Sequence, residues 1–153
     1  MIRNAFLLLA FALCGVASAQ SGPLDLQEAT SSATIEQVGT LNLATVAQMA
    51  SSVVLAQAGA SNEARIEQAG PGSHAIALRQ DGGSSATVLQ MGTGHALAGL
   101  DGLASDAIQT EGSLLLLMQT GTENVVHLHQ SAGAYADLTQ IGTGNAITAM
   151  QTR

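Results

Sequence analysis

Histidines and serines are the residues of this chain with the clearest capacity for chemistry. His127 and His129 stand two residues apart, a spacing at which one strand face could hold a metal ion. No third ligand accompanies them in register, so we interpret both as surface histidines. A nucleophilic enzyme needs a nucleophile, a base and an orienting group in one cleft. The serines here recur at regular turn-like positions instead, and the pattern predicts neither a catalytic centre nor a metal site.

The amino-terminal stretch has the composition of a secretory signal. A basic residue near the start precedes a short apolar run, and the small residues 17–19 fit a cleavage site before Gln20. We therefore expect residues 1–19 to be a signal peptide, because the apolar run is too short to span a bilayer. A lipoprotein signal that uses Cys14 is the alternative, but the bulky Leu13 before it disfavours that processing.

Composition after the signal argues against several classes of protein. Without Cys14 the exported chain has no cysteine, so it can form no disulfide bond. Three arginines accompany eleven acidic residues and there is no lysine, which argues against nucleic-acid binding through a basic face. Tyr135 is the sole aromatic residue in this part, so a core of large side chains is hard to build. The chain is nevertheless too apolar to be simply disordered.

Glutamine recurs at a nearly regular interval from Gln37 onward. Six residues before each glutamine stands a polar or small residue in nearly every case, and the positions between alternate small or aliphatic residues with variable ones. Alternation with a period of two predicts a β-strand with one face in the core. Asp101 occupies the one place where the series lacks a glutamine, and we interpret this place as a local defect.

Glycine two places after a glutamine marks reversals between strands, because glycine reaches positive φ without a Cβ penalty. The strands therefore come in pairs, and we expect one repeat domain over 31–151 after a short segment at 20–30. The turn glycines of the clearest repeats are Gly39, Gly59, Gly121 and Gly142. The expected strand–turn–strand units are 31–48, 51–68, 74–90, 95–109, 113–130 and 134–151.

Stacking of such units about 4.8 Å apart would place equivalent side chains above one another. Glutamine and asparagine amides carry both a donor and an acceptor, so they can hydrogen-bond along such a column. Polar columns fix the register, and the aliphatic pairs between them form a dry seam between two sheets. We therefore predict an all-β, amyloid-forming β-solenoid of about six rungs. The expected column residues are Ser31, Gln37, Asn42, Gln48, Ser51, Gln57, Asn62, Gln68, Gln80, Gln90, Gln109, Ser113, Gln119, Asn124, Gln130, Gln140, Asn145 and Gln151.

The unit 31–48 reads Ser-x5-Gln-x4-Asn-x5-Gln, which resembles the curlin repeat, the unit of the bacterial functional amyloid curli. The units 51–68 and 113–130 carry the same pattern without a gap, and 134–151 departs from it only by Ala134. The units between them are degenerate. The resemblance covers most of the chain after the signal.

The resemblance implies a structural protein with no enzymatic activity, no cofactor and no small-molecule substrate. Curlin subunits cross the outer membrane through a dedicated secretion pore and polymerise on the cell surface into pilus-like fibres for adhesion and biofilm formation. The implied partners are other curlin subunits, by end-to-end β-stacking, and the pore with its accessory factors. The stretches "SSVVLAQAGASNEARIEQAG" and "AMQTR" are more similar to the minor, nucleating subunit. The acidic composition is unlike nucleators, so the major fibre subunit is the alternative.

The ends of the predicted solenoid also favour polymerisation. Each rung satisfies its backbone groups by pairing with its neighbours, so uncapped ends expose unpaired strand edges. The last expected strand ends at Gln151, and the segment 20–30 contains Pro23 and is a weak cap. Head-to-tail contact between two different ends does not close and produces a filament. The alternative from another class is a soluble β-solenoid adhesin or binding module that stays monomeric.

Two groups of side chains stand out from the repeat. His74 and His95 occupy the position that asparagine holds elsewhere, so we interpret them as column members. Stacking of the two rings would make their rungs sensitive to pH. Leu114, Leu116 and Met118 place apolar residues on the outer face, which indicates either a partner surface or a strand covered by lateral packing.

Overall fold

The computed structural model describes residues 24–26, 31–49, 51–71, 73–101 and 106–152. The expected signal peptide at 1–19 and most of the segment 20–30 lie outside the described residues. Every regular element in the described part of the chain is a β-strand. No helix long and apolar enough to cross a membrane is present among these residues.

The strands follow one another through short turns. Their bounds are β1 Leu24–Leu26, β2 Ser32–Thr40, β3 Leu43–Gln48, β4 Ser52–Ala60, β5 Glu63–Ala69, β6 Ala75–Asp81, β7 Ser85–Thr93, β8 Ala96–Ala98, β9 Ala107–Gln109, β10 Leu114–Thr122, β11 Val125–Gln130, β12 Tyr135–Thr143 and β13 Ala146–Gln151.

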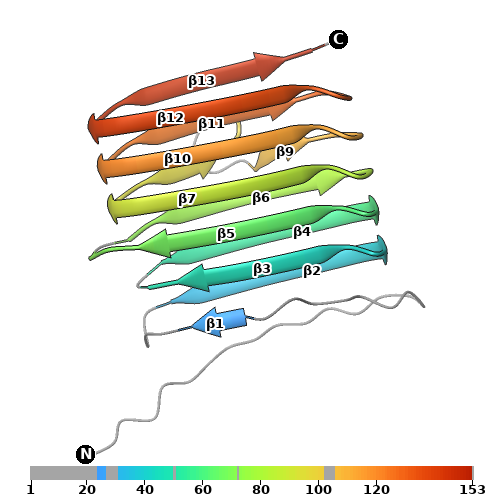
Figure 1. Cartoon of the computed structure of the whole chain (residues 1–153), viewed down its shortest axis with the longest axis horizontal. Coiled ribbons are helices and arrows are strands. Elements are labelled where there is room, and N and C mark those ends of the chain that lie inside the picture. The colour runs from blue at the N-terminus through green and yellow to red at the C-terminus, as the bar shows by residue number, and fades with distance from the viewer. Residues whose placement is uncertain (1–23, 27–30, 50, 72, 102–105, 153) are drawn as a thin grey trace, which may run out of the picture.

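Two parallel sheets face each other, and the chain alternates between them as it climbs from β2 to β13 (Figure 1). Sheet A has the order β1-β3-β5-β7-β10-β12, and sheet B has the order β2-β4-β6-β8-β11-β13, with β9 beside β8 in the same strand position. The prediction of an all-β solenoid is confirmed. It has about five turns, where the sequence predicted about six rungs.

The segment 95–109 explains the difference. The sequence predicted two strands joined by a turn, but the segment supplies one strand position in sheet B, divided into β8 and β9. Both pieces lie between β6 and β11. Residues 99–106 separate the two pieces in the sequence and are an insertion relative to the repeat, and Asp101 is exposed, outside the column to which its spacing assigned it.

This single strand changes the sheet to which every later strand belongs. The first strand of the unit 31–48 lies in sheet B, whereas the first strands of the units 113–130 and 134–151 lie in sheet A. As a result β10 pairs with β7, with Leu114 opposite Ser85. The expected stacking of six equal units is therefore wrong from residue 95 onward, although the strands themselves lie where the alternation predicted.

Aliphatic side chains of both sheets fill the space between them. The buried set is Ala33, Ala44, Val46, Val53, Leu55, Ala64, Ile66, Ile76, Leu78, Ala86, Val88, Leu97, Ala107, Leu115, Leu117, Val126, Leu128 and Ala136. The inward apolar side chains that are only partly buried are Ile35, Leu138, Ile147 and Ala149. All four belong to strands at the ends of the stack, where a neighbouring strand covers one side alone.

The turns depend on stacked glycines. All four turn glycines named from the sequence, Gly39, Gly59, Gly121 and Gly142, have positive φ. A Cβ on Gly121 would collide with the carbonyl oxygen of Gly142 in the next rung, and one on Gly39 would collide with that of Gly59. Glycine is required at positions 39 and 121 because the backbones of successive turns touch there.

Candidate functional site

A continuous column of glutamines runs the length of sheet B at the ends of its strands. Each Nε2 donates to the Oε1 of the next glutamine, always in the direction from β2 to β13. The donor–acceptor distances, in order, are 2.6, 2.9, 3.1, 3.0 and 3.0 Å for the column Gln37, Gln57, Gln80, Gln109, Gln130 and Gln151. Gln109 reaches this column because β9 pairs with β6 and β11, with Gln109 opposite Gln80 and Gln130.

Sheet A carries a second glutamine column with the same direction. From Gln68 the Nε2 groups donate to Gln90, Gln119 and Gln140 at 2.7, 2.6 and 2.7 Å. Gln48 begins the column but donates to two backbone carbonyls instead, and the Oε1 atoms of Gln48 and Gln68 are buried without a partner among the described residues. This column is thus incomplete at its amino-terminal end.

The glutamines also tie the two sheets together. In both columns a further Nε2–H bond reaches a backbone carbonyl at the start of a strand in the opposite sheet. Gln57 of sheet B donates to Leu43 of sheet A at 3.1 Å, and Gln140 of sheet A donates to Val125 of sheet B at 3.1 Å. These two amides therefore take part in a column and bond to the facing sheet at once. The sequence indicated the column bonds and gave no signal for these cross-sheet bonds.

Polar side chains that open the strands form two further columns. Asn42 Oδ1 accepts the side-chain and the backbone N–H of Asn62, each at 3.1 Å. At the other end of the chain Asn145 donates to Asn124 Oδ1 in the same way, at 3.1 and 3.0 Å. Where serine replaces asparagine the bonding changes, since Ser51 Oγ donates to a backbone carbonyl in its own turn.

The remaining serines of these columns differ in how they are satisfied. Ser84 and Ser113 lie 3.3 Å apart through their Oγ atoms, in successive rungs of sheet A. Ser31 Oγ is buried and has no hydrogen-bond partner among the described residues. No hydrogen bond joins any of these hydroxyls to a histidine in the part of the chain that the structure describes.

His74 and His95 stack in sheet B, with ring centroids 5.2 Å apart and fully buried side chains. His74 Nδ1 accepts the backbone N–H of His95 at 3.4 Å, and His95 Nδ1 accepts that of Asn124 at 3.3 Å. Each Nδ1 thus takes the place of an asparagine Oδ1 as the acceptor of a backbone N–H from the next rung. His95 Nε2 lies 2.9 Å from the carbonyl oxygen of Met91.

Burial is the main influence on the pKa of His74. It lowers that pKa below 6.5, and the neighbouring ring of His95 lowers it further. Backbone groups of Ala69 and Gly92 act in the opposite direction. The folded state therefore disfavours the protonated form of His74 relative to the unfolded chain.

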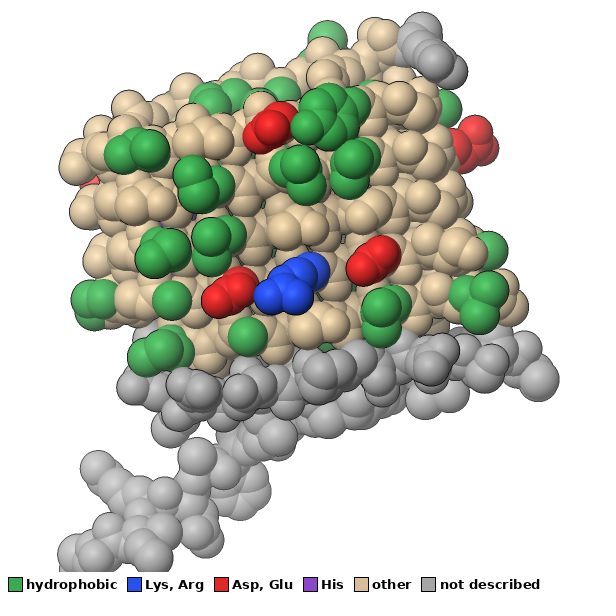
Figure 2. Space-filling view, viewed as in Figure 1, with side chains coloured by type: hydrophobic (Ala, Val, Ile, Leu, Met, Phe, Trp, Pro, Cys, Tyr) green, Lys and Arg blue, Asp and Glu red, His purple; other side chains and the backbone are tan. Residues whose placement is uncertain are grey.

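The outer face of sheet A is divided into a charged and an apolar part. β5 carries Glu63, Arg65 and Glu67 outward, and Arg65 pairs with Glu67 at 3.7 Å. This row lies below an area where hydrophobic side chains gather (Figure 2). In that area Met118 is exposed and its neighbours on β10, Leu114 and Leu116, are half-buried. Exposed apolar residues of β7 and β12 extend the area; they are Met91, Tyr135 and Ile141.

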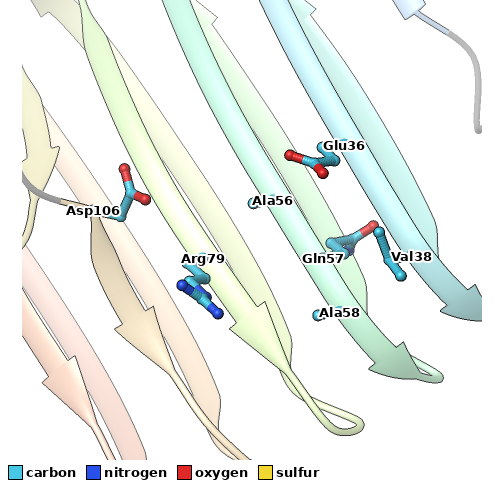
Figure 3. A pocket seen from close by; sticks show the side chains of 7 residues that line it. All are labelled: Glu36, Val38, Ala56, Gln57, Ala58, Arg79 and Asp106. Carbon is cyan, nitrogen blue, oxygen red and sulfur yellow. The ribbon is translucent and has the colours of Figure 1, made fainter. Parts of the chain in front are cut away.

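The outer face of sheet B carries the remaining histidines and a hollow. His127 Nδ1 lies 2.8 Å from the carbonyl oxygen of Gly99 in the insertion, and His129 is half-buried beside Met150. Among the described residues no group of three or more histidines, cysteines or acidic residues could hold a metal ion. The hollow is lined by Glu36, Val38, Ala56, Gln57, Ala58, Arg79 and Asp106 (Figure 3).

Comparisons with known proteins agree with the geometry of the columns. The family model described as the curlin associated repeat matches residues 31–70, the first two strand pairs of the solenoid. No curated protein and no solved structure matches the chain. The matched rungs and the rungs above them share the same glutamine columns, stacked turns and inward aliphatic pairs. The chain therefore carries curlin associated repeats over residues 31–70.

Proposed function

We propose that this chain is a secreted structural subunit of curli-type extracellular amyloid fibres, which serve cell adhesion and biofilm formation. The observation that carries the proposal is the combination of amide columns with open strand edges. β12 and β13 at one end, and β2 at the other, lack a strand partner on one side within the described residues. Unpaired N–H and C=O groups of such edges are templates for another chain.

The internal geometry of the solenoid also supports a fibre. Parallel, in-register strands with identical residues stacked in columns are the arrangement of cross-β assemblies. Gln37 lies opposite Gln57, and Gly121 opposite Gly142, without a shift in register. A subunit with this geometry already has the repeat of the fibre, so growth requires only further rungs. We propose a non-catalytic role on the same grounds.

Within the fibre we propose the role of the minor, nucleating subunit, with the major fibre subunit as the alternative. The similarity of the 51–70 stretch and of the carboxyl-terminal residues to minor subunits favours nucleation. A nucleator must expose an ordered edge before the partner does, and the glutamine column of sheet B, which is bonded without a break from Gln37 to Gln151, favours early ordering of this chain. Export through the curli secretion pore, with its accessory factors, and a location on the cell surface complete the proposal.

One feature favours a second candidate, a soluble β-solenoid adhesin or binding module. The apolar area on the outer face of sheet A, with Met118 and Tyr135 exposed, is the kind of patch that marks interaction sites. Such a module would use this face and remain a monomer. The oligomeric state of the dispersed chain therefore separates the two candidates.

The test combines fibre growth with seeding of a partner. Residues 20–153 are diluted from denaturant, and the product is inspected by electron microscopy and by fibre diffraction, where a meridional spacing of about 4.8 Å is expected. Trace amounts are then added to a major curlin while thioflavin fluorescence is followed. Removal of the partner's lag supports nucleation. A long lag of its own, shortened by its own seeds, indicates the major subunit, and a monomeric β-rich chain would leave the binding module.

A further inference from the structure

The two sheets of the solenoid differ by one in their number of long strand positions. Sheet B has six strand positions from β2 to β13, because β8 and β9 share one of them. Sheet A has five long strands from β3 to β12, and its sixth position is filled by the short β1. The insertion at 99–106 is the cause, since it leaves one strand where the spacing of the repeat predicts two.

β1 continues sheet A in the register of the repeat. Leu24 pairs with Val46 and Leu26 with Gln48, in parallel orientation. Val46 is 1% exposed, whereas Ile35, on the end strand β2 of the other sheet, is only partly buried. The strand position of β1 thus covers sheet A at this end. Its outer edge has no strand partner in the part of the chain that the structure describes.

The inward side chains at the two ends of sheet B are complementary in size. β13 presents Ile147 and Ala149, and β2 presents Ala33 and Ile35. The strand pairings place Ala33 and Ile147 in one column, and Ile35 and Ala149 in another. If β2 of a second copy continued these columns beyond β13, a small side chain would meet a large one in both. Such alternation fills a core without voids.

The direction of the glutamine column fixes the orientation of that second copy. Gln151 Nε2 donates one N–H to Tyr135 at 2.8 Å and has a second N–H to give. At the other end Gln37 Oε1 accepts no hydrogen bond from any described residue. A copy added in the same direction would therefore extend the column from Gln151 to Gln37. A reversed copy would bring two donors or two acceptors together.

We propose that copies of this chain join head to tail through a half-turn joint, in which β2 of one copy pairs with β13 of the copy before it and β1 pairs with β12. Continuing the register of the repeat pairs Thr34 with Thr148 in sheet B, and Asp25 with Thr139 in sheet A. β1 supplies the strand by which sheet A is short. The inference rests on the proposed function, because it specifies how the subunits of the fibre meet.

Disulfide crosslinking within grown fibres tests the joint. Four single variants, Thr34→Cys, Thr148→Cys, Asp25→Cys and Thr139→Cys, are made in the full chain carrying Cys14→Ser. Two variants are mixed in equal amounts, grown into fibres and oxidised, and disulfide-linked dimers are measured on a non-reducing gel. Paired residues of adjacent strands lie about 4.8 Å apart, within the Cα separation that a disulfide bond spans.

We expect dimers from the mixture of the Thr34 and Thr148 variants and from the mixture of the Asp25 and Thr139 variants. The swapped mixtures, Thr34 with Thr139 and Asp25 with Thr148, are matched controls and should lose the dimer, because their residues lie in opposite sheets. If a threonine variant does not assemble, Ser32→Cys with Ala146→Cys tests the same pairing of β2 with β13.

The other outcomes separate the joint from the proposed function. Fibres that give no dimer in either mixture would overturn the joint and leave the fibre subunit intact. Dimers in fibres grown from the Thr34→Cys variant without the second variant would mean that β2 of one copy pairs with β2 of another, which is head-to-head joining. Dimers in sheet B without dimers in sheet A would overturn the role of β1. Failure of the unsubstituted chain to form any fibre would overturn the proposed function itself.

Discussion

At the scale of single residues, one buried amide holds several neighbours in place. Gln90 accepts from Gln68 and donates to Gln119, and all three side chains are buried. A buried donor or acceptor that loses its partner is costly, whereas the bond itself contributes modestly. The columns therefore specify the register more strongly than they stabilise the fold, because a shifted register would leave every amide in the column unpaired.

Replacement of one glutamine in the middle of a column should be costly. Gln90→Leu keeps the approximate volume but leaves the Gln68 N–H and the Gln119 Oε1 without partners, at about 1–3 kcal/mol for each group. The guanidinium midpoint of the β-rich state should fall accordingly. Gln37→Leu, at the half-buried end of its column, is the matched control and should cost clearly less. Equal losses for both variants would contradict the role assigned to the columns.

Glycine stacking gives a second prediction at this scale. Gly121→Ala should destabilise strongly, because the residue has φ of +118° and its Cβ would meet the carbonyl oxygen of Gly142. Gly112→Ala is the control, since Gly112 has φ of +71° with no atom near its Cβ position. The control should show only the strain of a left-handed residue, about 1 kcal/mol. Thermal or denaturant unfolding of both variants measures the difference, and similar losses would rule out the stacking argument.

The stacked histidines predict an acid-sensitive fold. The pKa of His74 is lowered in the folded state, so the unfolded chain binds more protons below pH 6.5 and stability falls as the pH drops. The loss is at most about 1.4 kcal/mol per pH unit for one histidine, until the pH reaches the folded-state pKa. His74→Asn should flatten this dependence between pH 6.5 and 5, and His129→Asn on the outer face should not. An unchanged pH profile in the His74 variant would show that the stack is not responsible.

At the scale of elements, the strand between β6 and β11 is an ordinary repeat strand with an insertion. Residues 95–98 joined to 107–109 give His-Ala-Leu-Ala-Ala-Ile-Gln, which has the spacing of Ser31 to Gln37. The strand pairing agrees with this. Leu97 of β8 lies opposite Ile76 of β6, and Ala107 of β9 lies opposite Leu78 of β6.

Deletion of residues 99–106 should therefore leave the solenoid intact. We expect a guanidinium midpoint equal to or above that of the unaltered chain, because a continuous strand replaces two short pieces and a loop. Deletion of 99–107 is the control, since one residue more removes the inward Ala107 and takes Gln109 out of its column. That variant should lose stability. If both deletions were equally damaging, the insertion would be part of the fold and not an addition to it.

The same strand shows how far the sequence predicts the fold. Alternation and the glutamine spacing are local signals, so they indicate the strands, the turns and the columns of the regular units. Asp101 stands six residues after His95, the spacing of a column residue, and no local signal separates a degenerate strand pair from one strand with a loop. The pairing of β10 with β7 could therefore not be predicted from the sequence. The hydrogen bonds from Gln57 and Gln140 to the facing sheet could not be predicted either, because a period of two does not encode how the two sheets align.

At the scale of the whole molecule, the two ends of the solenoid differ from its middle. Inward side chains are buried in the central rungs, whereas Ile35 of β2, Leu138 of β12, and Ile147 and Ala149 of β13 are only partly buried. The amide columns have a direction, and the strands are parallel throughout. Under the proposed function we therefore expect copies to add in one direction, because a contact between two different ends does not close.

The central claim, assembly into an amyloid fibre, is tested most directly by thioflavin fluorescence of residues 20–153 diluted from denaturant at neutral pH. We predict growth to a plateau, acceleration by preformed seeds, and fibres that retain the parallel in-register rungs. A flat trace from a monomeric, β-rich chain would contradict the claim and leave a soluble solenoid whose open edges do not template further copies.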